Sequence, residues 1–328
     1  MQSESFRGKT TLITGGAGFI GAHLARRLVG LGAEVTLVDS LIPEYGGNLH
    51  NLNDIAERVR LNISDVRDPH SMRYLVQGID FVFSLAGQTS HMDSMQDPFT
   101  DLDINSRAQL SILEALRHHN PTARIIFAST RQIYGRPDYL PVDEKHPQRP
   151  VDVNGINKIA GESYHLLYHS VYGIRTCALR LTNTYGPGMR IKDARQTFVG
   201  IWIRCLLDGQ PFEVWGGDQL RDFNYVDDVV EAFLAAALNP AAWGRVFNLG
   251  SDEIVSLSQL ARTLVEVNGG GEFRKREFPA ERKKIDIGDY YSDFSFIHSE
   301  LGWEPRIGLR EGLRRTLEYF RVHGGRYF

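Results

Sequence analysis

The sequence has few features of a secreted, membrane-spanning or nucleic-acid-binding protein. It holds two cysteines, Cys177 and Cys205, among 328 residues. We expect these to be buried thiols of a cytoplasmic protein rather than a disulfide. No apolar run approaches the roughly 18 residues that a membrane helix needs, and the N-terminal residues lead almost directly into a strand, so we expect no membrane span and no signal peptide. With 37 basic and 40 acidic residues the net charge is −3, which gives no electrostatic indication of a nucleic-acid partner or an anionic membrane.

A metal site is also not expected. Glu162, His165 and His169 have helical spacing that could hold a metal, but the order H-E-x-x-H is absent.

The sequence does contain a glycine-rich turn between a strand and a helix. Residues 10–14 are apolar and β-branched, typical of a buried strand, and an apolar helical pattern follows. Between them, Gly15, Gly18 and Gly21 follow G-x-x-G-x-x-G. This spacing lets the backbone turn tightly and approach a pyrophosphate, with the phosphates at the helix N-terminus. The turn therefore predicts a dinucleotide site.

An acidic residue supports that prediction and selects the cofactor. A second predicted strand, 34–38, ends in Asp39, where a carboxylate can accept hydrogen bonds from the adenosine ribose. A 2′-phosphate there would meet a negative charge, so Asp39 favours NAD over NADP.

Strand and helix patterns alternate along the chain, which predicts an α/β fold with a doubly wound parallel sheet of the Rossmann type. We expect residues 1–180 to form the NAD-binding domain, to which the chain returns at about 221–250. Residues 181–328 are expected to form mainly a smaller, substrate-binding lobe. The predicted helices include 101–118, 153–172, 226–238 and 309–319.

Further motifs along nearly the whole chain extend this pattern. They are TGGAGFIG at 14–21, Asp65-Val66, LAGQ at 85–88, Asn105, STRQIYG at 129–135, NGINK at 154–158, RLTNTYGPG at 180–188, RDFNYVDD at 221–228, FNLG at 247–250 and LGWEP at 301–305. With these motifs the chain resembles the extended short-chain dehydrogenases, the family of nucleotide-sugar epimerases and dehydratases.

The resemblance implies a bound NAD and a nucleotide-sugar substrate. It also implies a homodimer formed through the helices 101–118 and 153–172. The residues implied to bind NAD are Gly15, Gly18, Phe19, Ile20, Gly21, Asp39, Asp65, Val66, Leu85, Ala86, Gly87 and Lys158.

The same resemblance implies a catalytic set with one departure. Thr130 stands where the family has a Ser or Thr that bonds the oxidised sugar hydroxyl, and Lys158 stands at the lysine of the Tyr-x-x-x-Lys pair. The tyrosine position holds Asn154, whose amide does not titrate and cannot take a proton as a phenolate would.

Several other groups could serve as the base. They are Lys158 with a depressed pKa, His91 in the loop after the fourth strand, Asp152 ahead of the helix, and Tyr134 or Tyr185. The residues alone do not rank them.

The residues after Thr130 restrict the reaction. In the resembling 4,6-dehydratases an Asp and a Glu follow the Thr, and in the resembling UDP-glucuronic acid decarboxylases a Glu stands at the second position. Here these positions hold Arg131 and Gln132, which do not shuttle protons as carboxyl groups do. We therefore favour an NAD-dependent epimerase acting at C4 of a UDP-sugar. The alternatives are a dehydratase or other oxidoreductase assisted by substrate or water, and a silent protein that binds NAD and sugar nucleotide.

Two residues are predicted to hold the diphosphate. By resemblance Asn183 meets a phosphate oxygen, and Arg221 has a planar fork that matches phosphate geometry. Lys192, Arg195 and Lys283 are weaker predictions for the same role.

Overall fold

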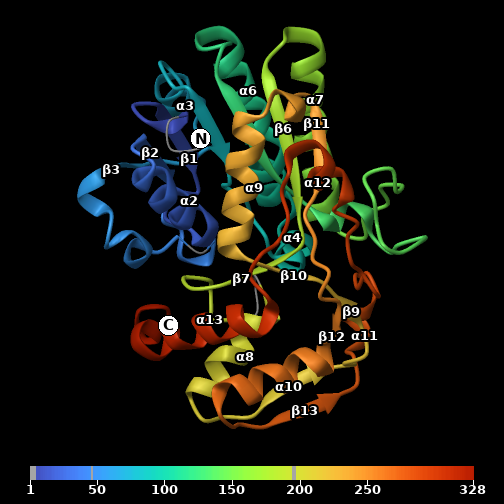
Figure 1. Cartoon of the computed structure of the whole chain (residues 1–328). Helices are drawn as coiled ribbons and strands as arrows, with labels where there is room; N and C mark the ends of the chain where they lie inside the picture. Colours follow the sequence, from blue (N-terminus) through green and yellow to red (C-terminus); the bar gives the residue numbers. More distant parts are fainter. Residues whose placement is uncertain (1–4, 46, 194–196) are drawn as a thin grey trace.

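A twisted parallel sheet forms the centre of the protein (Figure 1). The structure is a computed structural model that describes residues 5–45, 47–193 and 197–328. The seven strands have the order β11-β6-β5-β4-β1-β2-β3. Their bounds are β1 Thr10–Thr14, β2 Glu34–Asp39, β3 Val59–Ile63, β4 Phe81–Ser84, β5 Arg124–Thr130, β6 Arg175–Leu181 and β11 Arg245–Asn248. Every neighbouring pair is parallel, which confirms the predicted doubly wound sheet.

Helices cover both faces of the sheet. Successive strand residues point to opposite faces, so Ile13 packs in the cluster that includes α2 and α9, and Leu12 packs in the cluster that includes α3, α6 and α7. The helix bounds are α2 Phe19–Gly30, α3 Pro69–Leu75, α6 Ala108–His119, α7 Val153–Tyr172 and α9 Val226–Leu238. The central strands are therefore buried on both faces, and their continuous apolar runs follow from that position.

A second hydrophobic core lies beyond the carboxyl ends of the strands (Figure 1). Trp202, Leu260 and Phe320 lie in it. Its main elements are α8 Phe198–Leu207, α10 Leu257–Asn268, α13 Leu309–His323, and the parallel pair β8 Phe212–Trp215 and β13 Phe273–Arg276. The short strands are β7 Asn183–Tyr185, β9 Leu220–Arg221, β10 Phe223–Tyr225 and β12 Val255–Ser256, and the short helices are α4 His91–Gln96, α11 Ala280–Lys283 and α12 Ser295–Leu301. Among the described helices, none combines the length and apolar character needed to cross a bilayer.

One predicted helix is interrupted. The segment expected as a single helix over 101–118 consists of α5 Pro98–Leu102, a wide π turn Asp103–Arg107, and α6. The π turn contains the buried Asn105, whose Nδ2 donates to the carbonyl of Gln88 at 2.9 Å. Such turns occur frequently at functional sites, and the 3.6-residue periodicity does not show them.

A buried ion pair joins α7 to the sheet. Arg180 Nη2 lies 2.5 Å from Glu162 Oε1, and only 3% and 4% of the two side chains are exposed. Ser129 Oγ also donates to Glu162, at 2.7 Å. His165, one turn further on, stacks on Phe127 with the ring centroids 4.7 Å apart. These residues therefore have structural partners, and the described part of the chain contains no group of three or more metal-ligating side chains.

Glu162→Gln is expected to destabilise the protein by about 3–5 kcal/mol, because it leaves the Arg180 guanidinium buried without its counter-charge. Urea unfolding measures the effect. The matched control is Glu266→Gln, which removes an exposed pair with Arg310 and is expected to cost about 0–1 kcal/mol. Equal losses in the two variants would contradict a structural role for the buried pair.

Candidate active site

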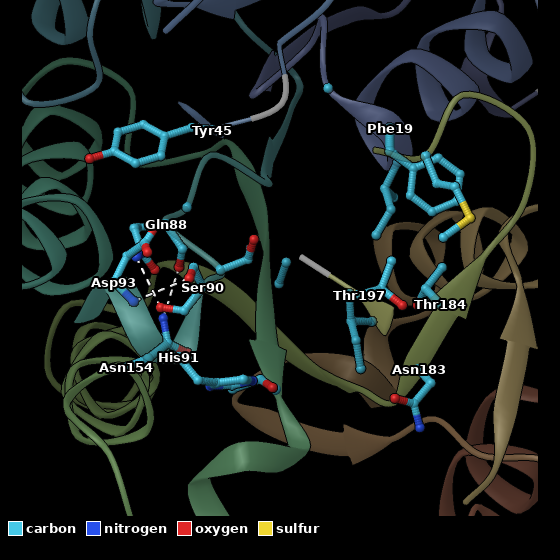
Figure 2. A pocket seen from close by; sticks show the side chains of 18 of the residues that line it. Phe19, Tyr45, Gln88, Ser90, His91, Asp93, Asn154, Asn183, Thr184 and Thr197 are labelled. Atoms are coloured by element: carbon cyan, nitrogen blue, oxygen red, sulfur yellow. Dashed lines mark hydrogen bonds between the residues drawn. The ribbon is translucent and has the colours of Figure 1, made fainter. Parts of the chain in front are cut away.

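A large cavity lies at the point where the strand order reverses. From β1 the chain continues to β2 on one side, whereas β4 is the neighbour of β1 on the other side. Loops diverge at such a point and leave a crevice that binds ligands in doubly wound folds. Here the cavity has a volume of about 1010 Å³ and is lined by the sheet ends and by residues of the second core. Figure 2 shows Gln88, His91 and Asn154 on one wall and Phe19, Thr184 and Asn183 on the opposite wall.

The glycines of the first turn are required by close backbone contacts. Gly15 has φ +70°, and a Cβ there would lie 2.9 Å from the amide nitrogen of Ala86. A Cβ on Gly21 would overlap the carbonyl oxygen of Gly15. Gly18 is the N-cap of α2, and Phe19 and Ile20 line the cavity beside it. The first N–H groups of a helix have no acceptor within the helix. Here this helix end lines the cavity, which suits the binding of a pyrophosphate.

Asp39 holds the loop after β2. Its Oδ2 accepts from the Ala17 N–H at 3.0 Å and its Oδ1 from the Leu41 N–H at 2.9 Å. Burial raises the pKa of Asp39, against the lowering effect of these backbone donors. The carboxylate lines the cavity, and each oxygen retains acceptor capacity for a ribose hydroxyl.

Two further residues predicted to bind the cofactor follow β3, the strand next to β2. Asp65 and Val66 line the cavity after β3. Arg67 donates four hydrogen bonds to Asp65: the backbone N–H to Oδ1 at 2.8 Å, Nε to both carboxylate oxygens at 3.0 Å, and Nη2 to Oδ2 at 2.6 Å. The structure thus assigns Asp65 a partner within the protein that the sequence did not indicate.

The loop after β4 brings backbone against Lys158. Leu85, Ala86 and Gly87 line the cavity, and a Cβ on Gly87 would lie 3.2 Å from Lys158 Nζ. The ammonium donates to the Ala128 carbonyl at 3.0 Å. Burial lowers the pKa of Lys158 to about 8, with Asp101 opposing. Lys158 therefore lies deep in the cavity and is not an exposed helix lysine.

Asn154 is a fixed structural residue one turn before Lys158. Its side chain is buried, and Nδ2 donates to the Gln88 carbonyl at 2.8 Å and to Asp101 Oδ2 at 3.0 Å. Asn157 donates to the other oxygen of Asp101, at 2.8 Å. The amide thus holds α7 against α5 and the loop after β4. Sequence reasoning missed Asp101, although two asparagines three residues apart on one helix could have indicated a shared partner.

His91 is a titratable side chain that lines the cavity. It begins α4, which packs on α7 through a bond from the Asn154 N–H to Ser94 Oγ, 3.3 Å long. His91 Nδ1 lies 2.9 Å from Asp152 Oδ2, and 38% of the His91 side chain is exposed. Figure 2 shows the residue on the cavity wall close to Asn154.

Asp152 is held from three sides. Its Oδ1 caps α7 by accepting from the Gly155 N–H at 2.7 Å, and Gln132 Nε2 donates to Oδ2 at 2.9 Å. Burial would raise the pKa of Asp152, but His91 and these donors hold it below its usual value. The contact between Oδ2 and His91 Nδ1 is close at 2.9 Å but lacks hydrogen-bond geometry, because Nδ1 has no hydrogen-bond partner among the described residues.

Thr130 is linked to Asp152 through Gln132. It ends β5, lines the cavity, and accepts from the Gln132 N–H through Oγ1 at 3.2 Å. Gln132 therefore joins Thr130 to Asp152.

The two tyrosines named as possible bases are occupied elsewhere. Tyr134 OH donates to Asn248 at 2.6 Å, and Tyr185 OH donates to the Leu309 carbonyl at 3.2 Å. Both are buried, and burial raises both pKa values. Neither is among the described residues that line the cavity, so the prediction that either could be the base is wrong.

Two of the predicted diphosphate residues, Asn183 and Arg221, line the cavity. Asn183 lines the cavity and donates to the Asp222 carbonyl at 2.9 Å. Arg221 also lines it, and its Nη2 lies 3.5 Å from Asp286. Lys283 has an exposed side chain and is not among the described lining residues, and Lys192 is likewise exposed. Arg195 lies outside the described residues.

Comparisons with known proteins agree with this site. The family model described as "NAD dependent epimerase/dehydratase family" matches residues 11–250. The chain belongs to this family. It is therefore an NAD-dependent enzyme of the extended short-chain dehydrogenase type, and the glycine turn and Asp39 are residues that fit NAD.

Named relatives match almost the whole length of the chain. A putative UDP-glucose 4-epimerase of Methanocaldococcus jannaschii is 34% identical over 313 residues, covering 94% of this chain and 98% of the relative. A UDP-glucuronic acid decarboxylase 1 of Xenopus tropicalis is 33% identical, covering 95% of this chain and 72% of the relative. The solved structure of a UDP-glucose 4-epimerase of Thermotoga maritima with UDP-glucose has a TM-score of 0.88 at 31% identity, covering 95% of this chain and 98% of that one.

Proposed function

We propose that the enzyme epimerises C4 of a UDP-sugar through a transient 4-keto sugar. The observation that carries the proposal is the close contact of the cavity-lining His91 with the buried Asp152, in a cavity that Thr130 and Lys158 also line. NAD supplies the chemistry of taking the C4 hydrogen with its electron pair and returning it to the opposite face. Similarity to named UDP-glucose 4-epimerases supports the same reaction.

In this proposal His91 replaces the missing tyrosine. Nε2 of His91 takes the proton of the C4 hydroxyl as the carbonyl forms, and Asp152 stabilises the resulting imidazolium. The same nitrogen returns the proton to the oxygen when the hydrogen returns to carbon, so no proton is gained or lost over the cycle. Thr130 Oγ1 bonds the reacting oxygen and keeps it within reach of the base.

The remaining residues bind and orient. Lys158 holds the nicotinamide-side ribose, and its positive charge lies close to the forming carbonyl. Asn154 positions α7 through Asp101 and does not exchange protons. Asn183 and Arg221 hold the diphosphate, and Lys283 contributes at most from outside the cavity. Residues 1–180 with the return at 221–250 bind NAD, and 181–328 mainly bind the sugar nucleotide.

Two other functions are less well supported. Elimination of water needs a second acid and base after Thr130, where Arg131 and Gln132 stand. A silent binding protein has no need of an imidazole placed beside a buried carboxylate, so the His91–Asp152 contact favours turnover.

We also propose a cytoplasmic homodimer formed through α5, the π turn, α6 and α7. Phe99, Leu102, Ile156 and Leu167 are exposed apolar side chains on these elements, with exposed fractions of 76%, 42%, 56% and 50%. Pairing of two copies would remove these side chains from water.

The test is incubation of the NAD-supplied enzyme with UDP-glucose, UDP-N-acetylglucosamine and UDP-glucuronate, followed by product analysis with proton NMR. The expected result is interconversion of at least one sugar with its C4 epimer. A 4-keto-6-deoxy product, or turnover of none of the three, would contradict the proposal.

A further inference from the structure

Arg131 is a cation in the cavity that has no hydrogen-bonding partner among the described residues. It directly follows Thr130 and lines the cavity. Within the described part of the chain, none of its nitrogens makes a hydrogen bond or an ion pair, and its Nε is enclosed with no acceptor. Its guanidinium carbon lies 5.6 Å from the centre of the Tyr290 ring.

This state is unusual for a guanidinium. Arginine carries five N–H donors, and an enclosed charge without partners is strongly unfavourable. Burial lowers the pKa of Arg131, with Asp222 opposing. A position that leaves all these donors unused is most simply explained by a ligand that binds them.

The neighbouring acids are already engaged. Asp222 Oδ1 accepts from the Thr182 hydroxyl, and Oδ2 accepts from the Ser292 N–H at 3.0 Å. Asp222 attracts Arg131, but the described residues include no ion pair between the two. Asp286 lies against Arg221 at 3.5 Å.

Arg221 differs from Arg131 in its fixed position. Its Nη1 donates to the carbonyls of Leu220 and Gly288, the first at 2.8 Å. Burial and, after it, the charge of Arg131 lower the pKa of Arg221 to about 10. Two guanidinium groups that repel each other at the cavity wall form a receptor for more than one anionic group.

The positions of Arg131 and Arg221 in the chain suggest different roles for the two arginines. Arg221 and Asn183 lie on the wall assigned to the diphosphate. Arg131 is bonded through the backbone to Thr130, the residue assigned to the reacting sugar hydroxyl. Its guanidinium interacts electrostatically with Asp222 and Arg221, so it lies between Thr130 and the wall assigned to the diphosphate. A sugar that joins the two would meet this charge, and a neutral sugar offers it no counter-charge.

We propose that Arg131 binds a carboxylate on the sugar ring, so that the preferred substrate is a nucleotide-linked uronic acid. The planar fork of arginine matches a carboxylate in bidentate geometry. The neutral Gln132 is consistent with this ligand, because its amide donates to Asp152 and adds no negative charge to the sugar end. The inference rests on the proposed function for the placing of the sugar beside Thr130.

Binding of UDP-glucuronate, UDP-glucose and UDP to the NAD-supplied protein, measured by isothermal titration calorimetry, tests the proposal. We expect the wild-type enzyme to bind UDP-glucuronate more tightly than UDP-glucose by roughly 10- to 100-fold, as for a hydrogen bond between charged groups. Arg131→Gln is expected to remove this preference and to leave the affinities for UDP-glucose and UDP unchanged. Arg131→Lys, which keeps the charge without the fork, should show an intermediate preference.

Two results would overturn the assignment. One is a wild-type enzyme that binds the uronate no more tightly than the neutral sugar, which needs no variant and so holds even where Arg131→Gln fails to fold. The other is an Arg131→Gln variant that loses affinity for UDP and both sugars equally, which would assign Arg131 to the diphosphate. Because the binding preference and epimerisation are measured in separate experiments, a uronate preference in a protein that epimerises nothing would contradict the proposed function alone.

Discussion

Replacement of His91 by glutamine is expected to lower kcat by about 10²–10⁴-fold, the usual contribution of a positioned general base. Glutamine keeps the approximate size and can still bond Asp152, but it does not titrate. The affinities for NAD and for the UDP-sugar should remain close to those of the wild type, because the change removes a proton acceptor and not a binding group. Steady-state kinetics and calorimetric titration of both ligands measure the two effects separately.

The matched control is His70→Gln. His70 also lies in the first turn of a short helix, α3, but is not among the described cavity residues. Its replacement should leave kcat within about threefold of the wild type. If His91→Gln also keeps kcat in that range, His91 is not the base and the role would pass to Lys158, whose pKa is about 8.

Gly21→Ala is expected to weaken NAD binding by at least about 100-fold. The new methyl group would overlap the Gly15 carbonyl, and the Gly16 Cα would lie 3.0 Å away. Because these are backbone atoms, α2 must move away from β1 and carry the phosphate-binding N–H groups with it. A displacement of about 1 Å at such a site costs on the order of 10²-fold.

Gly30→Ala in the same helix provides the control. No atom lies within 4 Å of a Cβ at that position, so the variant should bind NAD normally and gain up to about 1 kcal/mol of stability from the better helix former. Fluorescence titration with NAD and thermal unfolding of both variants distinguish the cases. A Gly21→Ala protein that binds NAD like the wild type would refute the assignment of this turn to the pyrophosphate.

Local signals in the sequence predict the elements well. The helix predicted over 153–172 has the same bounds in the structure, because Asp152 caps its first turn and Gly173 ends it with φ +70°. The strands are also predictable, since burial on both faces produces continuous apolar runs. The glycine turn and Asp39 could be assigned from spacing alone.

Predicting the site would have required knowledge of contacts between segments that are distant in the sequence. That Asp152 also holds His91 depends on the packing of α4 against α7, whose bonded residues Ser94 and Asn154 are 60 positions apart. Asn154 was correctly recognised as unable to titrate, but its partner Asp101 was not predicted. The hydroxyl of Tyr185 bonds a carbonyl 124 residues away. Local sequence patterns do not show this contact, so the sequence left Tyr185 open as a possible base.

The most direct test of the account follows the hydrogen at C4. The enzyme is supplied with NAD and turns over its UDP-sugar in deuterium oxide, and the C4 epimer is examined by proton NMR. The account predicts that C4 and C5 both retain protium, because the hydrogen that leaves C4 returns to the same carbon without exchange with solvent. Deuterium at C5 or C6 would indicate elimination chemistry, and deuterium at C4 would show that solvent supplies the hydrogen; either result would contradict epimerisation at this site by transient oxidation.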